Sequence, residues 1–138
     1  MNHPERLADY LKHISEAIDD ATAFLADCPS VDALAQDKRS QYAVIRALEI
    51  LGEAATRIQS AAPAFVAAHP GIPWHTMRGM RNTLIHAYAD IDLQVVFDTV
   101  KDDLPPLKHQ IAPLLTQLAQ EEAQQQRQER GHEQEDSR

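Results

Sequence analysis

The chain has 138 residues, of which 43% are apolar, 25% charged and 5% aromatic. This length suits a single globular domain and excludes a multidomain protein. No apolar run reaches the about 18 residues of a membrane helix, and the N-terminus lacks the apolar stretch of a signal peptide, so we expect a cytoplasmic protein with no membrane attachment. Cys28 is the only cysteine, which excludes an internal disulfide and any zinc site built on several cysteines.

The charge is unevenly distributed. A net charge of −8 argues against a general nucleic-acid binder. However, no Asp or Glu occurs from Ala54 to Ala89. A buried segment rich in proline and glycine would also lack acidic residues, but it would not contain arginines. The basic side chains of this stretch favour a local anion site; they are Arg57, His69, His75, Arg78, Arg81 and His86.

The first half of the chain predicts two long helices. Apolar residues spaced by three and four predict an amphipathic helix over residues 4–26, which should end before Pro29. Ser30 is a candidate N-cap for a short helical piece. A second long helix is expected from about residue 38 to residue 60. Residues 61–73 contain three prolines and a glycine, so we expect a connector with at most one helical turn.

The second half predicts further helices and no strand. A helix is expected over residues 74–88 and another over 93–104, after which Pro105 and Pro106 act as a stop or a restart. A last helix follows over residues 107–120. Residues 121–138 are polar and are expected to form a frayed helix that passes into a disordered tail. The predicted fold class is all-α, a bundle of four to five helices.

Residues 81–88 carry groups suited to phosphate chemistry. Arg81 supplies a fixed cation, Asn82 an amide, His86 an imidazole and Tyr88 a phenol. At about 100° per residue, Arg81 and Tyr88 lie within about 20° around a helix axis, whereas Arg81 and His86 are about 140° apart. Either the helix ends or bends near His86, or a second copy of the chain completes one site across a two-fold axis.

These groups are the ones that metal-free RNA cleavage requires. An arginine can hold a phosphodiester and stabilise the charge that develops in the transition state. A histidine can move the proton from a ribose 2′-hydroxyl or to the leaving 5′-oxygen, and Asn82 can orient the phosphate or the imidazole. The expected catalytic pair is therefore Arg81 and His86. Arg78 and His75 are candidates for binding phosphate or RNA.

A structural role remains an alternative for these residues. A lone histidine on a helix is more often a structural hydrogen-bonding group than a catalyst, and a tyrosine such as Tyr88 is more often the edge of a core. The seven histidines contain no His-x-x-x-His pair, so we expect no metal and no other cofactor.

Four blocks of sequence resemble the HepT-like branch of the HEPN superfamily. They begin at Tyr42 (YAVIRALEILGEAA), His69 (HPGIPW), Gly79 (GMRNTLIHAY) and Asp98 (DTVKDDLPPL) and occur in the order of the family. The third block contains the Arg-x4-His-x-Tyr signature. The resemblance covers roughly residues 5–118, and we expect a HepT-like helical domain over residues 1–120.

The resemblance implies an all-helical homodimer that acts as a metal-independent endoribonuclease, the toxin of a toxin–antitoxin pair. The implied partner is an MntA-like nucleotidyltransferase antitoxin that silences the toxin by transferring AMP to the signature tyrosine. Arg81 and His86 match the catalytic pair, Asn82 the polar residue after the arginine, and Tyr88 the AMP acceptor. Ala87 stands where many relatives have glycine or a charged residue.

Two other functions remain open. The chain could be a non-catalytic adaptor that binds a nucleotide or presents Tyr88 to a nucleotidyltransferase. It could also be a structural oligomerisation module, in which case alanine would be tolerated at Arg81, His86 and Tyr88. The RNA substrate is not specified by the sequence; tRNA is one candidate from the resemblance.

Overall fold

The computed structural model describes residues 4–86 and 91–136, with side chains over 6–80 and 91–131. The described residues form helices and no strand, as the sequence predicts. In chain order the elements are α1 (Pro4–Leu25), α2 (Val31–Ala35), α3 (Lys38–Ala61), α4 (Pro63–Ala68), α5 (Trp74–His86), α6 (Leu93–Asp98), a π-helical turn η1 (Thr99–Asp103) and α7 (Leu104–Asp136).

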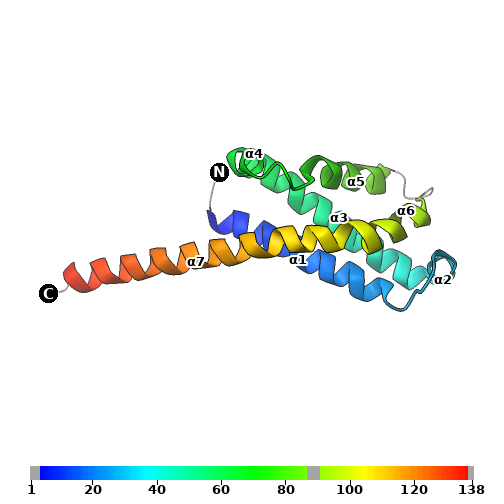
Figure 1. Ribbon diagram of the computed structural model, residues 1–138, viewed down its shortest axis with the longest axis horizontal. Coiled ribbons are helices and arrows are strands. Elements are labelled where there is room, and N and C mark those ends of the chain that lie inside the picture. Colours follow the sequence, from blue (N-terminus) through cyan, green and yellow to red (C-terminus); the bar gives the residue numbers. More distant parts are fainter. Residues whose placement is uncertain (1–3, 87–90, 137–138) are drawn as a thin grey trace.

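The long helices α1, α3 and α7 form the body of a bundle, and α3 packs against both α1 and α5 (Figure 1). The end of α7 extends well past the other helices. The side chains that share the core come from α1, α3, α5, α6 and α7 and include Leu11, Ile14, Leu25, Leu48, Leu51, Ile58, Met77, Val96, Leu104 and Ile111.

Polar caps define several helix starts. Ser30 accepts a hydrogen bond from the N–H of Ala33, which confirms the predicted cap of a short helix. Asp37 caps α3 by accepting from the N–H and the hydroxyl of Ser40. Asp92 caps α6 by accepting from the N–H groups of Gln94 and Val95. Each cap satisfies backbone donors that have no partner inside the helix.

The connector from residue 61 to residue 73 contains the single helical piece that was expected, α4, which begins at Pro63. Proline is tolerated there because the first N–H groups of a helix lack intrahelical acceptors. The second long helix, predicted over 38–60, is α3.

The sequence predicts that Pro105 and Pro106 act as a stop or a restart. In the structure they do not stop the helix. The chain remains helical from Leu93 to Asp136, and the N–H of Leu104 bonds to the carbonyl of Thr99, five residues earlier, in the wide turn of η1. Both prolines lie in the first turn of α7. The π-turn accommodates them because the missing proline N–H groups fall where the regular bonding pattern already changes.

The segment from residue 121, predicted as a frayed helix that passes into a disordered tail, continues α7 as a helix to Asp136. Nearly all its side chains from Glu121 to Gly131 are exposed, so tertiary packing does not hold this segment. It is rich in Gln, Glu and Arg, which have high helix propensity, and Gln117 donates to Glu121 one turn later.

None of the described helices has both the length and the apolar character that crossing a membrane requires.

Candidate active site

The connector that precedes α5 fixes where this helix begins. The indole N–H of Trp74 donates to the carbonyl of His69 at 3.0 Å, and the ring of Phe65 contacts the rings of His69 and Trp74 with centroids 4.3 and 6.1 Å away. Trp74 is buried. Because a buried indole N–H needs a partner, the hydrogen bond ties the first residue of α5 to the end of α4.

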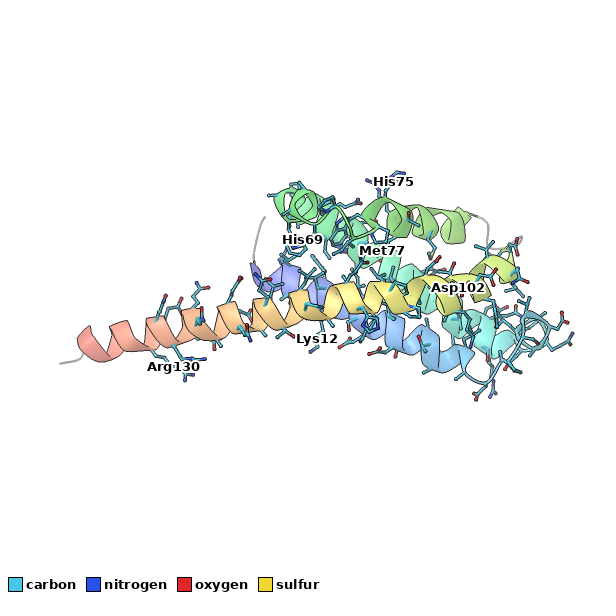
Figure 2. The ribbon with its side chains drawn as sticks, in the orientation of Figure 1. Lys12, His69, His75, Met77, Asp102 and Arg130 are labelled. Atoms are coloured by element: carbon cyan, nitrogen blue, oxygen red, sulfur yellow. The ribbon has the colours of Figure 1, made fainter. Side chains whose placement is uncertain are left out.

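The two faces of α5 differ in burial. Met77 lies in the core, whereas His75, Arg78 and Gly79 are exposed. Figure 2 shows His75 pointing away from the bundle and Met77 pointing into it. The exposed face of α5 therefore carries the two residues, His75 and Arg78, that the sequence offers as phosphate ligands.

Three of the remaining predicted site residues fall in the second half of this helix. Arg81, Asn82 and His86 are in α5, but their side chains are outside those described, and Tyr88 lies outside the described residues. The backbone of α5 is one continuous helix from Trp74 to His86. Helical periodicity places positions 81 and 86 about 140° apart around its axis, and the helix ends at His86, the position near which the sequence predicted an end or a bend.

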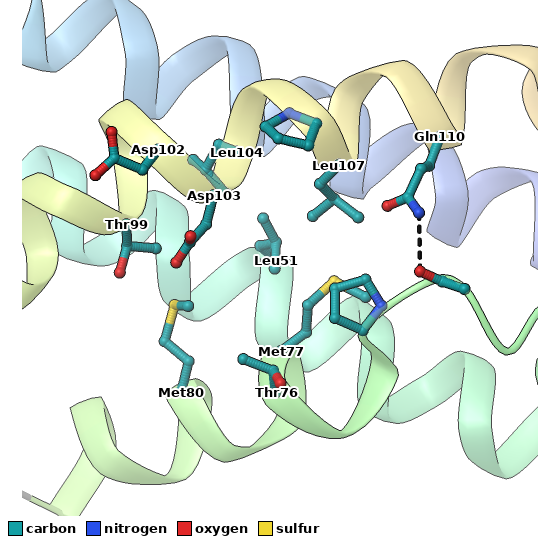
Figure 3. A pocket seen from close by; sticks show the side chains of 13 residues that line it. Leu51, Thr76, Met77, Met80, Thr99, Asp102, Asp103, Leu104, Leu107 and Gln110 are labelled. Carbon is teal, nitrogen blue, oxygen red and sulfur yellow. Dashed lines mark hydrogen bonds between the residues drawn. The ribbon is translucent and has the colours of Figure 1, made fainter.

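A cavity of about 350 Å³ lies beside α5 and was not predicted from the sequence. Its lining comes from α3, the start of α5 with the residues before it, η1 and α7 (Figure 3). Elements far apart in the chain form it, so no local pattern could have revealed it. The lining residues include Thr76, Met77, Met80, Thr99, Asp103 and Gln110.

The cavity and the exposed face of α5 differ in the sign of their charged side chains. Among the side chains that the structure describes, no Lys, Arg or His lines the cavity, and Asp102 and Asp103 lie on its η1 side. The described exposed face of α5 is basic through His75 and Arg78. An anion is therefore favoured on α5 and disfavoured in the cavity.

Among the described residues, no group of three or more His, Cys, Asp or Glu side chains is arranged to hold a metal ion.

The fold and this helix fit a helical ribonuclease domain, and comparison with known proteins gives its family. Residues 14–114 match the family model described as Ribonuclease HepT-like, so the chain belongs to the HepT-like ribonuclease family. No solved structure gives a significant match.

Curated relatives include a protein of Thermococcus cleftensis named "Probable ribonuclease HepT", which is 48% identical over 100 residues, covering 72% of this chain and 87% of the relative. A protein of Methanocaldococcus jannaschii named "Putative RNase" is 38% identical over 102 residues, covering 74% of this chain and 90% of the relative. The family match ends before the projecting part of α7.

Proposed function

We propose that this member of the HepT-like ribonuclease family is the toxin of a toxin–antitoxin pair, a metal-independent endoribonuclease with Arg81 and His86 as its catalytic residues. The observation that supports this most directly is that one continuous helix, α5, carries both positions next to exposed His75 and Arg78. The helix thus gathers the groups that bind a phosphodiester and move a proton.

In the proposed reaction, His86 accepts the proton of a ribose 2′-hydroxyl as its oxygen attacks the adjacent phosphorus. The bond from phosphorus to the 5′-oxygen breaks, and this leaving oxygen receives a proton from the imidazolium of His86. Arg81 stabilises the charge on the phosphoryl oxygens, and Asn82 orients the phosphate or the imidazole. The products are a 2′,3′-cyclic phosphate and a 5′-hydroxyl. All groups are supplied by the chain, so no metal is needed.

The proposed enzyme is a homodimer. The unbroken helix keeps Arg81 and His86 on different sides of α5 within one protomer. A two-fold axis near this helix would bring the arginine of one protomer to the histidine of its partner, giving composite sites.

The proposed regulation acts on Tyr88. An MntA-like nucleotidyltransferase transfers AMP from ATP to the phenol oxygen and releases pyrophosphate. The anionic adenylate then occupies Arg81 and repels the RNA phosphate. This silences the toxin without a large conformational change.

Incubation of the purified full-length protein with RNA in excess EDTA tests the nuclease. Cleavage is expected, and Arg81→Ala and His86→Ala should each lower it by about 100-fold or more. Arg46→Ala serves as a charge-matched control, because Arg46 is exposed on α3, pairs with Glu49 and lies outside the stretch that lacks acidic residues. Retained cleavage in both site variants would remove the assignment, and absence of cleavage in the wild type would favour the adaptor.

Coexpression with an MntA-like nucleotidyltransferase tests the regulation. Intact mass should increase by whole AMP units in the wild type and stay unchanged in Tyr88→Phe. Modification of Tyr88→Phe to the same extent would place the acceptor elsewhere.

A further inference from the structure

The cavity beside α5 presents hydrogen-bond acceptors. In Figure 3 the carboxylate of Asp103 points into the space between η1 and α5, above the side chain of Met80. The hydroxyl of Thr99 donates to the carbonyl of Val95 at 2.7 Å, and the amide nitrogen of Gln110 donates to the carbonyl of Gly71 at 2.8 Å. The hydroxyl proton of Thr99 and one of the two amide protons of Gln110 are thus engaged within the protein, whereas the carboxylate of Asp103 only accepts when ionised.

The rest of the lining is largely apolar. Met77 and Met80 come from α5, Leu51 from α3, and Leu104 and Leu107 from α7. Methionine adapts to flat unsaturated rings and contacts them favourably. A volume of about 350 Å³ lies at the lower end of the range for small-molecule sites. The cavity therefore suits one flat group with apolar faces and N–H donors on its edge.

The cavity lies close to the positions of α5 that are proposed to bind RNA. Met80 directly precedes Arg81, and positions 80 and 86 are about 9 Å apart along the helix axis. Around the helix axis, position 81 lies between Arg78 and Met80, so a phosphate held there would leave a neighbouring nucleotide beside the cavity. The acidic rim disfavours a phosphate there, so the base and not the backbone would enter.

We propose that this cavity is a base-selecting pocket of the ribonuclease, which takes one unstacked base bearing an exocyclic amino group. The inference rests on the proposed function for the placement of RNA on α5. The amino group donates to Asp103. Guanine is the best match, because its N1–H and N2–H can both donate to one carboxylate. Uracil is disfavoured, because its single imino donor lies between two carbonyls that would face the carboxylate.

Binding of non-cleavable RNA separates this pocket from the chemistry. The probes are short single-stranded 2′-O-methyl oligouridylates with one central G, C, A or U. Wild type should bind the G oligonucleotide about tenfold more tightly than the all-uridine one, the discrimination of one good pair of hydrogen bonds. Asp103→Asn should remove most of this preference, since its amide offers uracil a donor. Thr76→Phe, at an exposed lining position, should obstruct the mouth and weaken G binding without affecting all-uridine binding.

Asp98→Asn is the control for charge. Asp98 is exposed on α6 immediately before η1 and does not line the cavity. Asp98→Asn should retain the base preference. If Asp103→Asn instead strengthens binding of every oligonucleotide equally, Asp103 acts only as a general charge and the proposal is overturned.

The pocket proposal is also overturned if the wild type has no base preference. It is likewise overturned if both Asp103→Asn and Thr76→Phe retain the wild-type preference. The parallel cleavage assay on the ribose oligonucleotides distinguishes the two proposals. Cleavage that depends on Arg81 and His86 but not on the base refutes the pocket alone. Base-dependent binding without cleavage refutes the nuclease alone.

Discussion

The side-chain amide of Gln110 in α7 donates a hydrogen bond of 2.8 Å to the backbone carbonyl of Gly71, immediately before α5. This contact spans 39 positions of sequence and closes one end of the cavity (Figure 3). Together with the bond from Trp74 to His69 it holds the beginning of the helix that carries the proposed catalytic residues.

Gln110→Ala should loosen this attachment. We expect a loss of about 0.5 kcal/mol in the free energy of unfolding, at the low end for a hydrogen bond because Gln110 is exposed. Amide hydrogen exchange over residues 71–74 should become faster. Gln117→Ala is the control, since Gln117 pairs with Glu121 within α7. Equal exchange in the two variants would show that Gln110 does not restrain the connector.

Trp74→Phe should destabilise the protein by at least about 1 kcal/mol, because it leaves the carbonyl of His69 without its indole donor and removes buried apolar area. Urea unfolding measures this loss. His75→Ala, at the exposed neighbouring position, should change stability by less than about 0.5 kcal/mol. Similar effects of the two substitutions would contradict a specific anchor at Trp74.

A mixed-subunit experiment tests the composite site of the proposed homodimer. Arg81→Ala and His86→Ala are each expected to be inactive. After the two variants are unfolded together and refolded, half the dimers are mixed and each has one intact site, so about a quarter of wild-type activity should return. If both residues act within one protomer, mixing restores nothing.

The stability of the N-terminal end of α3 should depend on pH. Hydrogen bonds from the side chain and backbone N–H of Ser40 hold the pKa of Asp37 below its ordinary value of 3.8. Because the folded-state pKa is lowered, this contribution is present above the ordinary pKa and is lost as pH falls through the lowered one.

Asp37→Asn keeps an amide oxygen as the cap but cannot titrate. The stability advantage of the wild type over Asp37→Asn, measured by urea unfolding, should therefore shrink from about pH 7 to about pH 3. Ser40→Ala should move the loss to higher pH, because it removes the hydroxyl donor. A wild-type advantage that is constant over this range would exclude the mechanism.

Truncation after Gln120 tests the helical state of the projecting segment. Its side chains are almost all exposed, so the free energy of unfolding should change by less than about 0.5 kcal/mol. The far-ultraviolet helical signal per molecule should nevertheless fall, because α7 extends to Asp136 in the full chain. An unchanged signal would mean that the segment is disordered in solution.

The sequence was sufficient for the all-α class and for the extent of α3, because periodic apolar residues and breakers act locally. It also predicted one helical turn within the connector of residues 61–73, where α4 lies, and the cap at Ser30. Arg81 and His86 were found from their residue types and spacing; their roles remain predictions. Local patterns could not show that a π-turn would keep the chain helical through Pro105 and Pro106.

Only the tertiary structure decided where the cavity lies and which side chains face it. Met80, Asp103 and Gln110 carry no shared local signal, and they meet because α5, η1 and α7 are packed through a common core. Helical periodicity specifies which face of each element is buried, but not which faces meet. That choice depends on packing between distant segments, which stabilises one arrangement over its alternatives.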